Sequence, residues 1–283
     1  MKYLLPIAFI SLFALPALAC TGLMHKAKDG TAVNGRSVEF AVNLDIGGMV
    51  IPQGYAFKGT MPDGSSGMTY HAKYAVVGAN TFGGHAIIDG VNESGLSVGA
   101  FYFPGYAGYT KPTNENKTKA LSSVEYPNWL LTQFASVDEV KKHFNDAVIV
   151  PTAPKGWGIV PPFHYVVYDK SGKSVVIEPV DGELKIHDNP IGVITNSPTF
   201  DWHMTNLGNY INLTPVGAAP VSVDGVKLQA FGSGSGLHGL PGDFTPPSRF
   251  VRAAVFSASA IPADNAHDAV LQVFHLLNQL YYH

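Results

Sequence analysis

The chain has 283 residues, of which 46% are hydrophobic, 14% charged and 11% aromatic, with 30 Gly and 20 Pro spread along its length. This composition argues against a disordered chain and favours one globular domain over residues 20–283. Strand patterns interleaved with a few helix patterns predict an α+β fold. The formal net charge of −3 argues against a nucleic-acid partner, for which a basic patch is expected.

The first 19 residues have the pattern of a secretory signal peptide. Lys2 supplies a positive start, an apolar run covers residues 4–15, and Ala17 and Ala19 are the small residues before a cleavage site. The run is shorter than the roughly 20 apolar residues that a membrane-spanning helix needs. We therefore expect export to the periplasm or the medium of a bacterium, no membrane attachment after the signal is removed, and a mature chain that begins at Cys20.

Cys20 is the only cysteine of the sequence, and three interpretations of it stay open at this point. At a new N-terminus it would carry a free α-amine beside its thiol, so that nucleophile and base share one residue. A cysteine after a signal peptide is also where bacterial lipoproteins are acylated, although Ala17 stands where that motif usually has Leu and no flexible tether follows. The third interpretation is a small buried apolar side chain.

Alternating apolar residues and turn residues predict strands, and apolar residues at helical spacing predict helices. Asp29-Gly30 indicates a hairpin that begins at Cys20. The expected strands are 21–25, 31–40, 74–78, 85–89, 95–103, 163–169, 174–179, 183–188 and 192–196. The expected helices are 126–134, 136–145, with Ser136 and Glu139 as a capping box, 248–260 and 266–282.

Other site chemistries find little support in the sequence. The eleven histidines are scattered singly, and no His-Glu-x-x-His motif or cysteine pair occurs, so no metal is expected. Residues 234–239 fit Gly-x-Gly-x-x-Gly, but Leu240-Pro241-Gly242 follows instead of a helix, which indicates a tight loop. The cysteine therefore carries the functional hypothesis.

An N-terminal cysteine has specific chemistry. A free thiol is only partly ionised at neutral pH, so it needs a base or a positive neighbour. The α-amine of the same residue can take the proton, and Arg36, at the end of the predicted hairpin, is a cation that would stabilise the thiolate.

The sequence resembles the choloylglycine hydrolase family, which comprises penicillin V acylases and conjugated bile acid hydrolases. The resemblance rests on ordered motifs between Cys20 and Tyr282. They are Cys20-Thr21, Lys28-Asp29-Gly30, Gly35-Arg36-Ser37-Val38-Glu39, the segments 92–96 and 101–105, Asp169 to Asn189, 195–200, and 239–243 with 248–252. The resemblance implies an N-terminal nucleophile amidase with a four-layered αββα fold that needs no metal or cofactor. It also implies a homo-oligomer, namely a homotetramer.

By the same resemblance, the nucleophile falls on Cys20, the active-site arginines on Arg36 and Arg249, and the oxyanion-hole asparagine on Asn196. Glu39 stands where the family usually has Asp. The second oxyanion position, tyrosine in penicillin V acylases and asparagine in many bile acid hydrolases, falls on Tyr102. Met24, Phe101, Phe103 and Trp157 are expected to bind an apolar acyl group.

We thus expect a cysteine-dependent amidase of the penicillin V acylase type, acting on a small-molecule amide. Amidases of bile acid conjugates or of N-acyl homoserine lactones are the alternatives. A lipid-anchored binding protein without turnover is the alternative of another class. Family members usually continue past the segment that matches residues 266–282 with strands that complete the sandwich. Either the C-terminus is shortened here or the sequence is incomplete, and a chain without those strands would have an open sheet edge.

Overall fold

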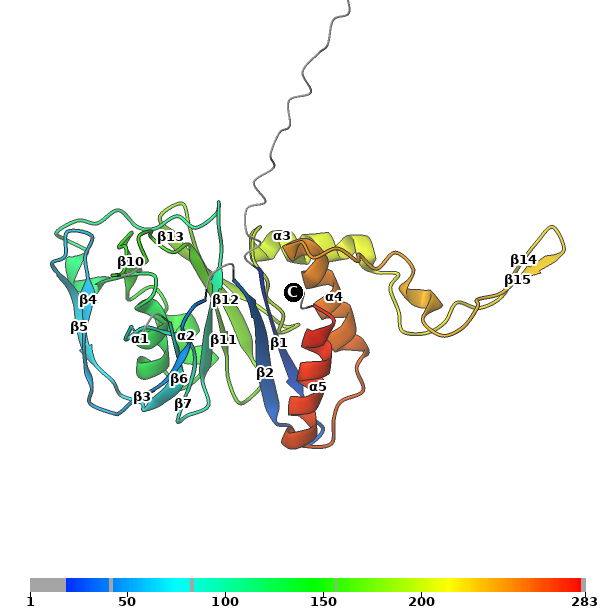
Figure 1. The fold of residues 1–283 in the computed structure, drawn as a ribbon, viewed down its shortest axis with the longest axis horizontal. Coiled ribbons are helices and arrows are strands. Elements are labelled where there is room, and N and C mark those ends of the chain that lie inside the picture. Colours follow the sequence, from blue (N-terminus) through cyan, green and yellow to red (C-terminus); the bar gives the residue numbers. More distant parts are fainter. Residues whose placement is uncertain (1–18, 41–42, 82–83, 156, 281–283) are drawn as a thin grey trace, which may run out of the picture.

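The computed structural model describes residues 19–40, 43–81, 84–155 and 157–280. Its elements stack in four layers, helices, a large sheet, a hairpin sheet and helices again (Figure 1). The expected α+β fold with αββα layering is therefore confirmed. Apart from Ala19, the predicted signal peptide lies outside the described residues.

The large sheet has seven antiparallel strands, and it forms the second layer. Asp181 and Gly182 both have positive φ, as a tight hairpin between the two strands at one edge requires. In spatial order the strands are β13 (Glu183–Asp188), β12 (Ser174–Val180), β11 (Phe163–Tyr168), β8 (Ser97–Tyr102), β7 (Ile87–Asn92), β6 (Val76–Asn80) and β3 (Gly47–Ile51).

The first layer consists of the helices α1 (Tyr126–Gln133) and α2 (Val137–His143), which cover one face of the large sheet. Ser136 caps α2, because its hydroxyl accepts the N–H of Glu139 at 3.3 Å. Beside them lie β4 (Ala56–Thr60), β5 (Ser66–His71), η1 (Lys117–Lys119), β9 (Ala120–Leu121) and β10 (Val148–Ile149).

The third layer is the hairpin of β1 (Ala19–Lys26) and β2 (Ala32–Glu39), which packs on the other face of the large sheet. On the side of β1 away from β2, Gly22 and Ile194 exchange two backbone hydrogen bonds. The segment 192–196, expected as a strand, is held to β1 by this isolated bridge. The hairpin thereby brings the start of the chain next to residues from its last third.

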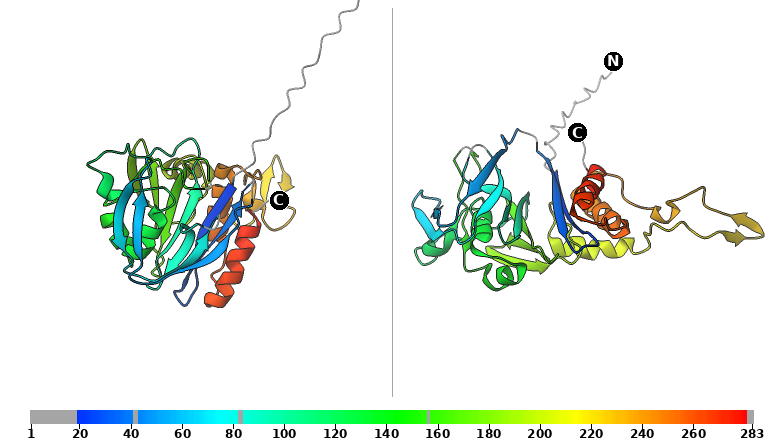
Figure 2. Two further views of the ribbon diagram at one scale, coloured as in Figure 1. Left: turned by 60° about the vertical axis from the view of Figure 1, so that its left-hand side comes forward. Right: turned by 90° about the horizontal axis from the view of Figure 1, so that it is seen from below.

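The fourth layer contains α4 (Pro246–Ser259) and α5 (Ala266–Asn278), which pack on β1 and β2 (Figures 1 and 2). α3 (Phe200–Leu207) lies across one end of the hairpin and leads into η2 (Gly208–Tyr210). An arm then projects from the body, with β14 (Val221–Val223) and β15 (Val226–Leu228) near its tip and η3 (Ser235–Leu237) on the return.

The hairpin covers only part of the inner face of the large sheet. Val50, Val77 and Val91 are cross-strand neighbours on β3, β6 and β7, and their exposed fractions are 72, 53 and 40%. Within the described residues, no strand pairs with the outer edge of β2.

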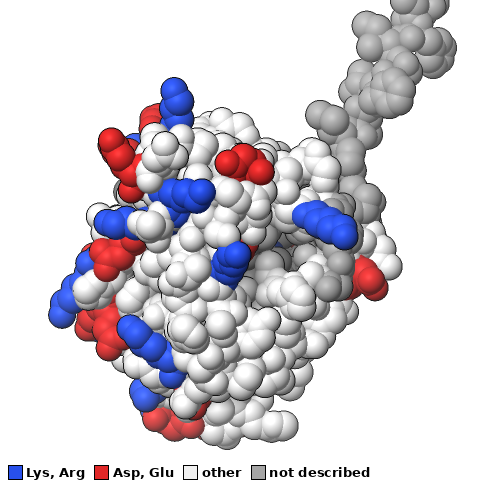
Figure 3. Space-filling view, turned by 90° about the vertical axis from the view of Figure 1, so that its left-hand side faces the viewer, with Lys and Arg blue, Asp and Glu red and all other residues white. Residues whose placement is uncertain are grey.

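The surface on the side of the large sheet away from α4 and α5 carries charges of both signs. Lys and Arg side chains alternate there with Asp and Glu, and a broad area beside them has no charge (Figure 3). Among the described helices, none is both long and apolar enough to cross a bilayer.

Candidate active site

Cys20 lies at the start of β1, where the hairpin sheet meets the end of the large sheet. It is 3% exposed and pairs with Val38 across the hairpin. Its backbone N–H donates to Oδ1 of Asn196 at 2.8 Å. The atom that would become the α-amine after cleavage is therefore already held by a side chain.

Arg36 lies beside the Cys20 side chain, and both line one small cavity. Its Nη1 donates to both carboxylate oxygens of Asp89, at 3.0 and 2.9 Å, and to the Ala100 carbonyl at 2.8 Å. The guanidinium also stacks over the Phe101 ring at 4.0 Å. Burial would lower the pKa of Arg36, but Asp89 and the Cys20 side chain outweigh it and raise that pKa. A fixed cation beside sulfur is the arrangement that stabilises a thiolate.

Asn196 and Arg249 form the other wall of the site, and both are at most 1% exposed. Arg249 comes from α4, and its Nη2 donates to the same Asn196 Oδ1 at 2.8 Å. Its Nη1 donates to the Cys20 carbonyl and to the Thr21 hydroxyl. Asn196 Nδ2 donates to the Tyr102 carbonyl at 2.7 Å. The asparagine amide thus has one fixed orientation between β1 and β8.

Glu39 lies opposite Ala19 in the hairpin register and is 8% exposed. Neither carboxyl oxygen has a hydrogen bond of normal geometry within the described residues, although the Ser37 hydroxyl is near. Burial raises the pKa of Glu39 against the opposing influence of Ser37, Arg249 and Arg36. A buried carboxyl without a firm partner, beside the start of β1, is suited to receive an ammonium group.

The cavity at Cys20 is small, with a volume of about 20 Å³, and its walls are mostly apolar, with four aromatic side chains among them. The rings of Phe40 and Phe163 both meet the Tyr102 ring edge-on, at centroid distances of 5.8 and 6.4 Å. Trp157 meets Phe163 edge-on at 5.8 Å. The lining residues are Cys20, Arg36, Val38, Phe40, Leu44, Thr81, Ile88, Ala100, Tyr102, Trp157 and Phe163.

Of the four residues expected to bind the acyl group, Trp157 lines this cavity, and Met24, Phe101 and Phe103 do not. Phe101 and Tyr102 are neighbours in β8, so their side chains point to opposite faces of the sheet. Phe101 packs under Arg36, and Phe103 stacks on His164 at 4.2 Å. Met24 packs in the core between the hairpin and its neighbours. These three side chains thus lie outside the cavity at Cys20 in this structure, and their role in binding the acyl group stays a prediction.

The model of the choloylglycine hydrolase family, described as linear amide C–N hydrolases, matches residues 20–282. The chain belongs to this family. The matched segment begins at Cys20 and contains every residue of the site described above.

Three relatives of known name illustrate the range of the family. The bile salt hydrolase/transferase of Clostridium perfringens is 37% identical over 263 residues, which are 92% of this chain and 78% of that protein. The crystal structure of a variant of the conjugated bile acid hydrolase from Clostridium perfringens has a TM-score of 0.80 at 34% identity, with 92% of this chain and 79% of that chain covered. The penicillin V acylase of Pectobacterium atrosepticum is 29% identical over 210 residues, which are 71% of this chain and 55% of that protein.

As a member of the choloylglycine hydrolase family, the chain is a hydrolase of linear amide C–N bonds. The six residues that the resemblance assigned to catalysis, Cys20, Arg36, Glu39, Tyr102, Asn196 and Arg249, lie around one point of this structure. Their individual roles remain predictions. Within the described residues, no group of His, Cys, Asp or Glu side chains forms a metal-binding cluster.

Asp89, Phe40 and Phe163 belong to the site but were not predicted from the sequence. Asp89 follows two buried isoleucines in a strand, and nothing local marks it as the partner of an arginine 53 positions earlier. Phe40 and Phe163 stand at strand ends, where alternation alone does not distinguish a cavity wall from a core residue.

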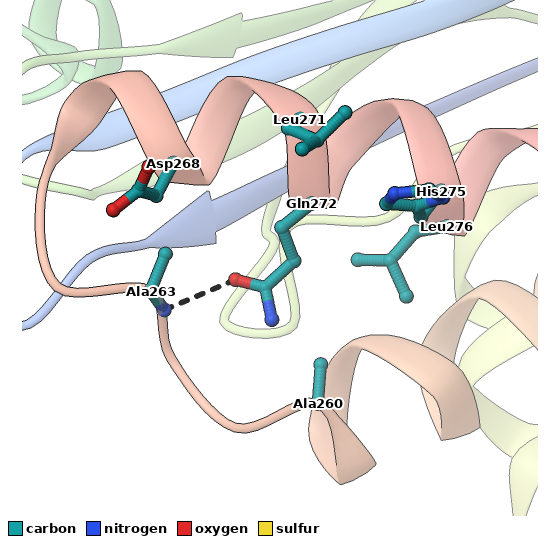
Figure 4. A pocket seen from close by; sticks show the side chains of 7 residues that line it. All are labelled: Ala260, Ala263, Asp268, Leu271, Gln272, His275 and Leu276. Carbon is teal, nitrogen blue, oxygen red and sulfur yellow. Dashed lines mark hydrogen bonds between the residues drawn. The ribbon is translucent and has the colours of Figure 1, made fainter.

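A larger cavity of about 460 Å³ lies between the end of α4 and α5 (Figure 4). Its walls include Leu271, Leu276 and His275, and the Gln272 amide oxygen accepts the N–H of Ala263 at 3.1 Å. None of the catalytic residues predicted from the sequence lines this cavity. The chemistry is therefore assigned to the smaller cavity at Cys20.

Proposed function

We propose that the mature protein hydrolyses amides of small aromatic carboxylic acids, with phenoxyacetyl amides such as penicillin V as the model substrates. The observation that carries this proposal is that Cys20 lines the same small cavity as the aromatic residues Phe40, Tyr102, Trp157 and Phe163. Aromatic side chains in the wall offer edge-on and stacking contacts to an aromatic ring, which favours an aromatic acyl group.

In the proposed reaction, the Cys20 sulfur attacks the amide carbonyl while the α-amine of Cys20 takes the thiol proton. The Asn196 amide and backbone N–H groups near Tyr102 donate hydrogen bonds to the oxyanion. In other enzymes, each such donor lowers the free energy of the transition state by about 3 to 4 kcal/mol. The C–N bond then breaks, and the amine leaves with the proton from the Cys20 ammonium. Water hydrolyses the thioester to a carboxylic acid and restores the thiol.

Hydrolysis of bile acid conjugates is the second candidate, because relatives above 30% identity are named bile salt hydrolases. Steady-state kinetics on penicillin V, a glycine-conjugated bile acid and an N-acyl homoserine lactone separate the candidates. We expect the highest kcat/KM on penicillin V. A higher value on the bile acid conjugate would overturn the assignment of the acyl group and leave the amidase chemistry in place.

Cys20→Ser in the mature chain is expected to lower kcat on the best substrate by at least roughly 100-fold, because an alkoxide is much harder to form than a thiolate. Cys20→Ala should abolish turnover. Undiminished hydrolysis by either variant would place the nucleophile elsewhere.

We further propose that the protein is exported and that removal of residues 1–19 both follows export and creates the catalytic base. A chain in which Cys20 is still bonded to Ala19 should be inactive, since its nitrogen is an amide. Mass spectrometry of the mature N-terminus tests this. A free amine and unmodified thiol are expected, and a triacylated Cys20 would favour the lipid-anchored binding protein.

We propose, finally, that the protein is a homo-oligomer that assembles through its arm. Val221, Val223, Val226 and Leu228 lie on one face of the β14–β15 hairpin, each at least 50% exposed. An isolated two-stranded hairpin is at best marginally stable in water, so this exposed apolar face is expected to pack against a second copy of the chain.

Val221→Ser with Leu228→Ser should therefore lower the molecular mass of the protein measured by light scattering. Lys227→Ala, on the opposite face, should not. A monomeric parent protein would overturn this proposal.

A further inference from the structure

A buried polar cluster lies behind Asn196 and takes no part in the mechanism proposed above. It consists of Glu178 on β12, His164 on β11 and His203 on α3, with exposed fractions of 0, 1 and 2%. Burial of such groups is costly unless their hydrogen bonds are made. Both histidines hydrogen-bond the backbone of the site wall, His164 at the Thr195 carbonyl and His203 at the Asn196 carbonyl.

The first route from Glu178 runs through His164. The ring Nδ1 is 3.1 Å from Glu178 Oε1, and Nε2 is 3.1 Å from the Thr195 carbonyl oxygen. A carbonyl can only accept, so Nε2 carries a proton and donates it to Thr195. A second proton must then lie between Nδ1 and Oε1. The Phe103 ring stacks on His164 at 4.2 Å with an interplanar angle of 4°, which fixes the plane of the imidazole.

The second route runs through α3. The same Glu178 Oε1 accepts the N–H of Phe200, the first residue of this helix, at 3.0 Å. Three residues further on, His203 Nε2 lies 2.9 Å from the Asn196 carbonyl oxygen, to which it donates. Burial lowers the pKa of His203 to about 4, so the ring is neutral, and its Nδ1 has no partner in the described residues. The single proton is therefore on Nε2. Phe250 stacks on this ring at 4.6 Å.

We propose that Glu178 is a positioning residue that acts through His164 and His203 to hold the backbone of Thr195 and Asn196. This backbone aims the Asn196 side chain, whose Oδ1 is 2.8 Å from the Cys20 nitrogen and whose Nδ2 is 2.7 Å from the Tyr102 carbonyl oxygen. The inference rests on the proposed function in one respect, namely that Asn196 acts on the reacting amide.

A matched pair at His203 tests the hydrogen bond itself. His203→Gln places an amide N–H close to the former Nε2, whereas His203→Leu has a similar volume and no donor. Displacement of a catalytic group by about 1 Å costs roughly 100-fold in rate. We therefore expect kcat to fall about 10- to 100-fold in His203→Leu, with KM within about threefold, because the cavity walls that bind the acyl group are untouched. His203→Gln should recover most of kcat.

Glu178→Gln keeps an acceptor for Phe200 but removes the acid that shares a proton with His164, so it should also lower kcat more than it changes KM. If His203→Leu does not fold, Glu178→Gln tests the positioning role in its place. His187→Gln is the control, because the His187 ring comes only within 3.5 Å of Glu178 Oε2 and makes no hydrogen bond to Thr195 or Asn196 within the described residues. Its kinetics should equal those of the parent. Equal losses in His203→Leu and His203→Gln, or no loss in both His203→Leu and Glu178→Gln, would overturn the inference.

Crystal structures of the mature parent and of His203→Leu separate this inference from the proposed function. If the parent hydrolyses none of the three amides, the proposed function has failed, and the structures still decide the positioning role. We expect the Asn196 amide to leave hydrogen-bonding distance of the Cys20 nitrogen in His203→Leu. An unchanged Asn196 in that variant would contradict the positioning role.

Discussion

At the scale of single residues, the site depends on how its charged side chains are held. Next to Cys20, the Arg36 guanidinium contacts the Asp89 carboxylate, the Ala100 carbonyl and the Phe101 ring. Asp89 is the charged partner among these three. The Ala100 carbonyl and the Phe101 ring remain if the Asp89 charge is removed. The guanidinium should then stay near the thiol with a less defined orientation.

We predict that Asp89→Asn lowers kcat about 3- to 10-fold, since a fraction of the roughly 0.5–2 kcal/mol that such contacts contribute is lost. Arg36→Ala should cost more, because it also leaves Asp89 partly buried without its cation. Kinetics on the best substrate measure both variants. A larger loss in Asp89→Asn than in Arg36→Ala would show that Asp89 acts on the substrate directly.

The buried carboxyl of Glu39 should make the stability of the folded chain depend on pH. Its pKa in the folded chain is raised above its ordinary value of 4.5, chiefly by burial. The folded state thus binds this proton more firmly than the unfolded state. The contribution of Glu39 to stability is present below its unfolded pKa and is lost as the pH rises through its folded pKa.

In a chain that retains Ala19, the free energy of unfolding should therefore fall as the pH rises above about 4.5, and Glu39→Gln should reduce this fall. In the mature chain the Cys20 ammonium becomes available to pair with Glu39, so the fall should be smaller. Urea unfolding at a series of pH values measures all three proteins. The same slope with and without the Glu39→Gln change would show that other groups cause the dependence.

At the scale of elements, strand β1 carries the nucleophile, and its position depends on a close approach at Gly22. A Cβ there would lie 2.7 Å from the Phe101 ring and 2.9 Å from the Ile194 side chain. Both neighbours are at most 1% exposed and cannot move away freely. Cys20, two residues earlier, would shift with the strand.

Gly22→Ala should thus destabilise the protein by about 1–3 kcal/mol, as overpacking does, and lower kcat as well. Gly48→Ala is the matched control. Gly48 lies in β3, no neighbouring atom is within 4 Å of where its Cβ would be, and the φ of Gly48 is not positive. That substitution should leave activity unchanged and stability equal or slightly higher. Chemical unfolding and kinetics on both variants test the pair, and equal effects would contradict the argument.

The sequence predicts the elements that local patterns define. β11 and β12 are continuous apolar strands bounded by the turns at 169–172 and 181–182, and both occur where expected. The Asp29-Gly30 turn predicts the hairpin, which places Arg36 opposite Gly22 and so near Cys20. These features need only neighbours along the chain.

Other features depend on contacts that no local pattern reports. The strands β4 and β5 lie largely at the surface, so they lack a clear apolar alternation and were not predicted. The eight residues of α3 are too few to show a helical period. The meeting of Cys20 with Asn196 and Arg249, 176 and 229 residues later, could be expected only from the family resemblance. The cluster around Glu178 was not expected at all.

At the scale of the whole molecule, the described layers leave part of the inner sheet face in contact with water. Val77 lies in the middle of this uncovered row, whereas its neighbour Val76 is 2% exposed and points into the core under α1 and α2. The two positions share one strand and one residue type, and they differ in the face to which they point.

We predict that Val50→Thr with Val77→Thr lowers the fluorescence of a bound apolar dye such as ANS and changes the free energy of unfolding by no more than about 0.5 kcal/mol, because both side chains are exposed and threonine keeps the β-branched shape. Val76→Thr should instead cost about 1–3 kcal/mol, since it buries a hydroxyl without a partner. Dye binding and urea unfolding of the three proteins measure these effects. Strong destabilisation by the Val50→Thr and Val77→Thr pair would mean that this face is covered in the protein in solution.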